Sequence, residues 1–115
     1  MSDLDKKPML ISVALTSCAE EQLEHLETTD IEQIDSKMQE VQGQQLLQLR
    51  KAEVLKDLLP KPLQELVIGS FRLLGQTVPI GSLRDCMFWV VDIQRKRGRI
   101  LPKKVREAAA KKLQK

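Results

Sequence analysis

Aromatic residues are scarce in this chain of 115 residues, which contains Trp89, Phe71, Phe88 and no tyrosine. This composition argues against an aromatic-rich β-sandwich and against a platform on which RNA bases stack. Cysteine is equally sparse, because Cys18 and Cys86 make no disulfide framework, and a reducing compartment is therefore favoured. With a single histidine and no closed Cys/His cluster, the sequence predicts no metal site.

Long hydrophobic runs and targeting signals are also missing. The longest uncharged apolar stretches, around 9–15 and 86–91, fall far short of the roughly 20 residues that a transmembrane helix needs. The first residues carry charges without the apolar segment of a signal peptide, so we expect a cytoplasmic protein with no membrane span. The length suits one domain, and 42% hydrophobic with 30% charged residues is typical of a globular chain.

The chain does have a strong separation of charge. Residues 1–60 contain 6 Lys/Arg against 12 Asp/Glu, whereas residues 61–115 contain 13 against 4. The net charge of +3 therefore conceals an acidic first half and a basic second half. Residues 95–115 alone hold 10 basic residues and one acidic residue. A basic end of this density predicts an anionic partner, which is nucleic acid, an anionic membrane surface or an acidic protein surface.

Helix signals dominate the first half. Residues 1–8 are typical of a flexible terminus, and residues 9–15 fit either a short strand or an apolar helix start. A capping-box spacing predicts a helix over 18–27. A long central helix is predicted over 31–59, where two prolines stop it, and Gly43 weakens its middle by about 1 kcal/mol relative to alanine.

Three further helices are predicted in the second half. Residues 63–74 follow a proline and precede a glycine, which are helix start and stop signals. Residues 83–97 have similar boundaries, with a buried strand over 87–93 as the competing interpretation because its aromatic and β-branched residues favour strands. In either case we expect Trp89 in the buried core. A last helix, basic over most of its surface, is predicted over 102–113.

These segments predict an all-α fold, a compact helical domain of about four to five helices with a long central helix and a basic C-terminal helix. Its acidic part spans 9–60 and its basic part spans 61–115. Four apolar residues of the acidic part follow the spacing of a helix seam, and a chain of this length buries only a modest core alone, so we expect a homo-oligomer. The seam residues are Ile31, Ile34, Met38 and Val41.

Few residues suggest catalysis. Cys18 and His25 lie two helical turns apart, like a nucleophile and base, but no orienting third group accompanies them. Cys86 is expected to be a small buried residue, and Asp92 is expected to pair with Lys96 on one helix face. No phosphate loop, dinucleotide fingerprint or serine elbow is present. We therefore predict neither enzyme activity nor a cofactor.

The basic end carries the functional prediction. Its cations fall on consecutive helical turns, where arginine binds phosphate by paired hydrogen bonds and lysine acts as a point charge. No aromatic residue lies among them, so backbone binding to duplex DNA is favoured over base stacking. We expect a small nucleic-acid-binding regulatory protein that acts as a dimer. The alternative is an interaction adaptor or assembly component whose acidic and basic halves dock to each other or to successive subunits. The predicted nucleic-acid contacts are Arg95, Lys96, Arg97, Arg99, Lys103, Lys104, Arg106, Lys111 and Lys112.

Overall fold

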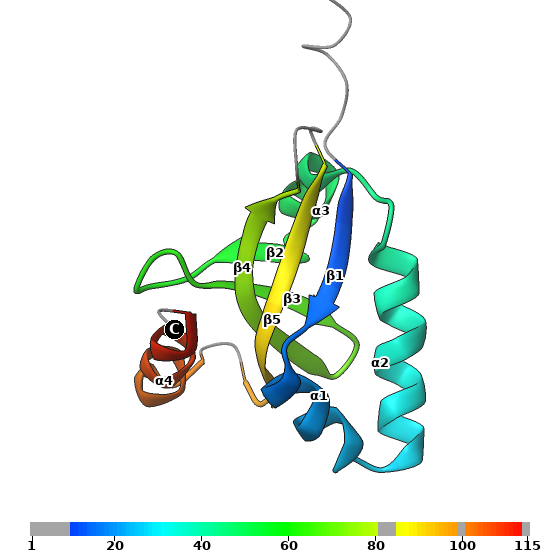
Figure 1. Cartoon of the computed structure of the whole chain (residues 1–115), viewed down its shortest axis with the longest axis vertical. Helices are drawn as coiled ribbons and strands as arrows, with labels where there is room; N and C mark the ends of the chain where they lie inside the picture. Colours follow the sequence, from blue (N-terminus) through cyan, green and yellow to red (C-terminus); the bar gives the residue numbers. More distant parts are fainter. Residues whose placement is uncertain (1–9, 81–84, 99–100, 114–115) are drawn as a thin grey trace, which may run out of the picture.

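Among the residues that the structure describes, five β-strands form one mixed sheet with helices on both faces (Figure 1). The computed structural model of the chain describes residues 10–80, 85–98 and 101–113, so the predicted flexible terminus at 1–8 lies outside the described residues. The strand order is β1-β5-β4-β3-β2, and the all-α prediction is wrong, because the described part of the chain is an α/β fold with four helices. In chain order the elements are β1 (Ile11–Leu15), α1 (Ser17–Glu24), α2 (Thr28–Val41), α3 (Leu46–Lys51), β2 (Leu55–Asp57), β3 (Gln64–Ile68), β4 (Phe71–Pro79), β5 (Cys86–Arg95) and α4 (Lys103–Leu113).

β1 lies at one edge of the sheet, so the strand interpretation of residues 9–15 is the correct one for 11–15. It pairs in parallel with β5, the last strand of the chain. The outer edge of β1 is closed at its start, because Gly43 N donates to Ile11 O at 2.8 Å and Ile11 N donates to Gln44 O at 3.0 Å. A covered edge of this kind opposes pairing with a strand of another chain.

The predicted long helix over 31–59 is divided into two helices and a strand. α2 ends at Val41, and Gly43 follows with a φ of +82°, a backbone conformation that disfavours any side chain. The chain then forms α3 and enters β2. Gly43 therefore marks the end of a helix instead of weakening the middle of a longer one.

A β-hairpin replaces the predicted helix over 63–74. β3 and β4 pair antiparallel with Ile68 opposite Phe71, which leaves Gly69 and Ser70 as a two-residue turn. Gly69 has a φ of +58° at the first turn position, where tight hairpin turns require a positive φ. A Gly-Ser pair between two apolar runs is a hairpin signal, and it outweighs the proline and glycine that suggested helix ends.

β5 occupies most of the predicted helix over 83–97, so the competing strand over 87–93 is the correct interpretation. A bulge interrupts the pairing of β4 with β5 between Leu74 and Gly75. A β-carbon on Gly75 would lie 1.9 Å from the carbonyl oxygen of Trp89. Glycine is therefore required at this position for the two strands to approach so closely.

Two apolar clusters hold the helices onto the sheet. One contains Leu73 and Phe88 with buried residues of α1, α2 and α3. The other contains Leu74 with Ala109 of α4, which confirms the predicted basic C-terminal helix and places it on the opposite face. Trp89 belongs to neither cluster and is 37% exposed, so its predicted burial in the core is wrong.

Candidate nucleic-acid interface

α4 turns an apolar stripe towards the sheet and its basic residues outward. Val105, Ala109 and Leu113 recur every fourth residue and join the cluster beneath the helix. The small buried side chains of Ala109 and Ala110 bring the helix close to the sheet. Among the predicted contact residues of α4, Lys103, Lys104 and Lys111 are exposed, and Arg106 and Lys112 are half-buried.

The cations at the end of β5 separate onto different faces of the sheet. Arg95 pairs with Asp30 of α2 at 2.8 Å and lies 4.8 Å from the ring centre of Phe71, on the side of the acidic helices. Lys96 and Arg97 instead line clefts on the α4 side. Arg99 lies outside the described residues. Arg95 also lines the cleft that contains Arg97, although its guanidinium pairs with Asp30, so the predicted set is only partly brought together.

Two clefts meet at Arg72. One, of about 280 Å³, is lined by Lys56, Glu65, Arg72 and Lys96, together with a valine. The other, of about 310 Å³, is lined by Arg72, Gln94, Arg95 and Arg97, together with residues at the start of α4. The clefts bring Lys56 of β2, which the sequence did not predict as a contact, together with Lys96 and Arg97, and Val105 of α4 lines the second cleft.

Arg72 is the buried centre of this region. Its side chain is 4% exposed and its Nη1 lies 2.7 Å from Oε2 of Glu65, which is equally buried. Its Nη2 donates to the carbonyl oxygen of Gly98 at 2.7 Å. A guanidinium held by two such bonds is rigid, and the second bond fixes the segment that carries Lys96 and Arg97. The sequence signal for this role is a charged residue within an apolar run.

Asp92 does not pair with Lys96, contrary to the prediction from helical spacing. It is buried on β5, where its carboxylate accepts hydrogen bonds from Gln22 at 2.6 Å and Gln94 at 2.9 Å. Lys112 Nζ lies 3.5 Å from the same carboxylate. This contact anchors the end of α4 to β5 and neutralises part of the charge of Lys112.

Intramolecular partners occupy two further cations of α4. Arg106 donates to the carbonyl oxygen of Leu59 at 3.2 Å, and Lys103 lies 3.8 Å from Glu107. Exposed pairs of this kind are weak, so Lys103 stays accessible to another anion. Within residues 10–80, 85–98 and 101–113, the cations of this surface whose side chains form neither an ion pair nor a hydrogen bond are Lys56, Lys96, Arg97, Lys104 and Lys111.

The sheet stands between the acidic helices and α4 (Figure 1). α1 and α2 carry most of the carboxylates of the first half and cover one face, while α4 covers part of the other. α4 reaches α1 at Asp92, whose carboxylate contacts both Gln22 and Lys112, but within the described residues no ion pair joins α4 to a carboxylate of α1 or α2. The exposed lysines of α4 lie away from the sheet.

The predicted self-association stripe lies on α2 and faces the chain's own sheet. Ile34 and Val41 are buried in the core cluster, and Met38 packs against it. Ile31 is half-buried. A partner chain on this stripe would therefore contact chiefly Ile31 and Met38, and oligomerisation through it stays a prediction.

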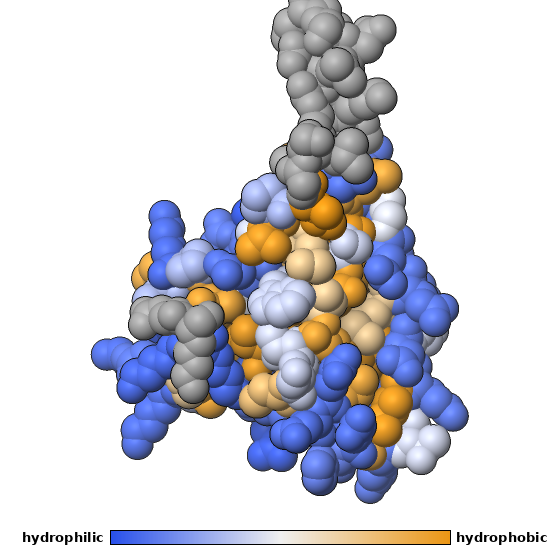
Figure 2. All heavy atoms as spheres, in the orientation of Figure 1, coloured by the Kyte–Doolittle hydropathy of each residue, from blue (hydrophilic) through white to orange (hydrophobic). Residues whose placement is uncertain are grey.

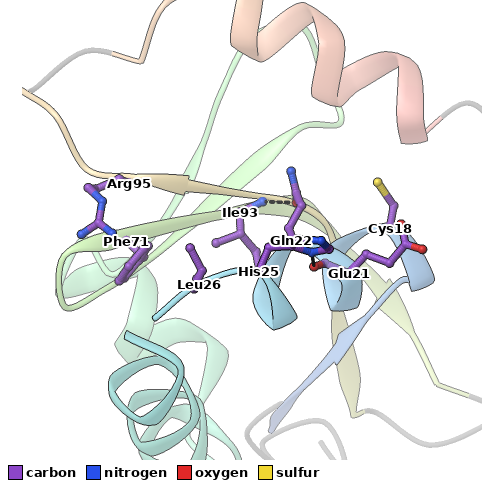
Figure 3. A pocket seen from close by; sticks show the side chains of 8 residues that line it. All are labelled: Cys18, Glu21, Gln22, His25, Leu26, Phe71, Ile93 and Arg95. Atoms are coloured by element: carbon purple, nitrogen blue, oxygen red, sulfur yellow. Dashed lines mark hydrogen bonds between the residues drawn. The ribbon is translucent and has the colours of Figure 1, made fainter. Parts of the chain in front are cut away.

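Cys18 and His25 both line a pocket of about 440 Å³ between α1 and the end of β5. Figure 3 shows Glu21 and Gln22 between them, and His25 Nδ1 lies 2.7 Å from the carbonyl oxygen of Glu21. The histidine ring is thus engaged with its own helix. This arrangement does not form the contact that a nucleophile and its base require.

Neither a metal centre nor a membrane segment is found in the described part of the chain. No group of three or more His, Cys, Asp or Glu side chains among those residues is placed to hold a metal ion. No helix within the same ranges combines the length and the apolar character needed to cross a membrane. Comparison of the chain with protein-family models, with curated proteins and with solved structures found no match.

Proposed function

We propose that the protein binds the phosphate backbone of nucleic acid through its basic surface. The observation that carries this proposal is the convergence of Lys56 of β2 with Lys96 and Arg97 at the end of β5 around Arg72, on the face of the sheet that α4 also covers. We define the basic surface as Lys56, Lys96, Arg97, Lys103, Lys104, Arg106, Lys111 and Lys112.

The spacing of the cations on α4 suits a regular polyanion. Lys104 and Lys111 are exposed and lie two helical turns apart, which is about 10 Å along the helix axis. Both side chains lie on the same side of the helix, because seven residues complete almost two full turns. Contacts at both ends of the helix can therefore be made by one backbone.

The cations without an intramolecular ion pair are the strongest expected contacts. An exposed lysine without a carboxylate partner breaks no existing ion pair when it meets a phosphate, and each neutralised phosphate releases counterions. Lys112 must share its charge with Asp92, so its contribution is smaller. We rank Lys104 and Lys111 first on α4, and Lys96 and Arg97 first at the end of β5.

The test is the salt dependence of binding to labelled oligonucleotides by fluorescence anisotropy. Lys104→Ala and Lys111→Ala should each weaken binding and reduce the slope of log affinity against log salt by about 0.7–0.9. Lys51→Ala is the matched control, because Lys51 is an exposed cation of α3, on the opposite face of the sheet. Equal effects at all three positions would show non-specific charge attraction and refute a defined surface.

A second candidate function is assembly by complementary charge. The acidic α1 and α2 lie on one side of the sheet and the basic α4 on the other, so successive copies can meet head to tail. Sedimentation at increasing salt separates the two functions. An assembly component dissociates as salt rises and binds no oligonucleotide at low salt, whereas a nucleic-acid-binding protein binds the oligonucleotide there.

A further inference from the structure

α4 covers only part of its face of the sheet. Beyond it, β1, β5 and β4 carry two cross-strand rows, in which Trp89 stands opposite Ala14 and Gln76, and Met87 opposite Ser12 and Val78. Figure 2 shows apolar and weakly polar residues gathered over these strands, with hydrophilic residues on both sides. We call these residues the open sheet face: Ser12, Ala14, Gln76, Val78, Met87 and Trp89.

Trp89 is the most prominent side chain of the open sheet face. It is 37% exposed, whereas the other members are half-buried. Its direct neighbours across the strands are the methyl group of Ala14 and the uncharged Gln76, and directly paired residues lie about 5 Å apart at their β-carbons. A large aromatic ring beside a small neighbour keeps surface available for stacking.

The basic end of α4 borders this face. Lys112 Nζ is 3.5 Å from Asp92, which lies three residues beyond Trp89 on β5, or about 10 Å along the strand. Lys111, on the same last turn, is exposed. The fold thus brings the last turn of α4 to the strand that carries an exposed aromatic side chain, about 10 Å along β5 from it.

We propose that the open sheet face binds the bases of single-stranded nucleic acid, with Trp89 as the stacking platform and Lys111 and Lys112 on the adjacent backbone. This inference rests on the proposed function and specifies single-stranded nucleic acid as the ligand. Aromatic stacking combined with a basic track is the usual means of holding a single strand, because every base has a stacking face. In a duplex those faces are already occupied by neighbouring bases, so the predicted preference for duplex DNA is replaced by one for single strands.

Charge argues against a second copy of the chain as the occupant of this face. Two copies packed face to face would each bring the basic end of α4 to the border of the contact. Like charges held close together oppose association. A single strand instead supplies negative charge beside the cations and apolar ring surface over Trp89.

Trp89 is the one tryptophan of the chain, so its intrinsic fluorescence reports on the face directly. An oligothymidine strand should quench this fluorescence and bind more tightly than a duplex of the same length. Inorganic polyphosphate, which has no bases, should compete for the cations without the same quenching. Trp89→Ala should lower single-strand affinity by about 5- to 150-fold at an unchanged salt slope. Trp89→Phe should retain part of the affinity because it keeps an aromatic ring.

Leu47→Ala is the control, since Leu47 is 59% exposed on α3, away from the open sheet face. Circular dichroism of each variant establishes that it is folded. Equal affinity for duplex and single strand, with no loss in Trp89→Ala, would overturn the inference and leave backbone binding intact. Absence of binding to either nucleic acid at low salt would refute the proposed function itself. A fall in sedimentation mass in Trp89→Ala with unchanged oligothymidine affinity would assign the face to self-association and also overturn the inference.

Discussion

Replacing Arg72 by methionine removes the cation from the buried ion pair at the centre of the basic surface. Methionine fills much of the same space. The Glu65 side chain, which is only 4% exposed, then loses the cation that lies 2.7 Å from its carboxylate. Removing one partner of a buried pair costs about 3–5 kcal/mol. The free energy of unfolding of an ordinary domain is about 5–15 kcal/mol, so Arg72→Met should lose a large part of the stability of the protein.

The double variant Glu65→Leu/Arg72→Met separates the buried charge from the packing. It removes both charges, and such replacements are often neutral or stabilising. We expect urea unfolding followed by circular dichroism to place the double variant well above Arg72→Met in stability. Because the Arg72 bond to Gly98 is lost in both, each should also bind oligonucleotide more weakly. A cost below about 1 kcal/mol in Arg72→Met, or no recovery in the double variant, would refute the buried pair.

Three further predictions concern the fold. Gly75→Ala should destabilise the protein by about 1–3 kcal/mol or more in urea unfolding, because the new β-carbon meets the backbone of Trp89; wild-type stability would contradict the close approach. Ile34→Asp should unfold the chain by circular dichroism rather than yield a folded monomer, since Ile34 is fully buried against the sheet. Burial, and to a smaller extent the charge of Asp85, raises the pKa of the Cys86 thiol. A thiol reagent should therefore modify the exposed Cys18 in the native protein and Cys86 only after unfolding. Rapid modification of both cysteines in the native protein would refute this prediction.

The parts of the structure that could be predicted from the sequence are those set by local signals. Pro102 and the alanine-rich stretch that follows are sufficient to indicate α4, and the density of lysine and arginine indicates the basic surface. The hairpin at Gly69–Ser70 can also be predicted from the sequence, because its turn residues and its flanking apolar runs are local signals.

The fold class depends on pairing between distant residues, which local patterns do not report. β1 is ambiguous alone and becomes a strand because β5, far along the chain, supplies its hydrogen-bonding partners. The same topology exposes Trp89, although the apolar sequence around it predicts burial in the core. Arg72 is held in place by its contacts with Glu65 and Gly98, which only the folded chain brings together.

The salt dependence of oligothymidine binding to the unmodified protein tests the central claim most directly. The account predicts tight binding at low ionic strength, where charges are least screened. It also predicts a linear fall of log affinity with log salt, with a slope of about −0.7 for each phosphate contacted. Contacts by the unpaired cations Lys56, Lys96, Arg97, Lys104 and Lys111 would give a total of about −3.5. No measurable binding at low ionic strength, or binding that does not change with salt, would contradict the account.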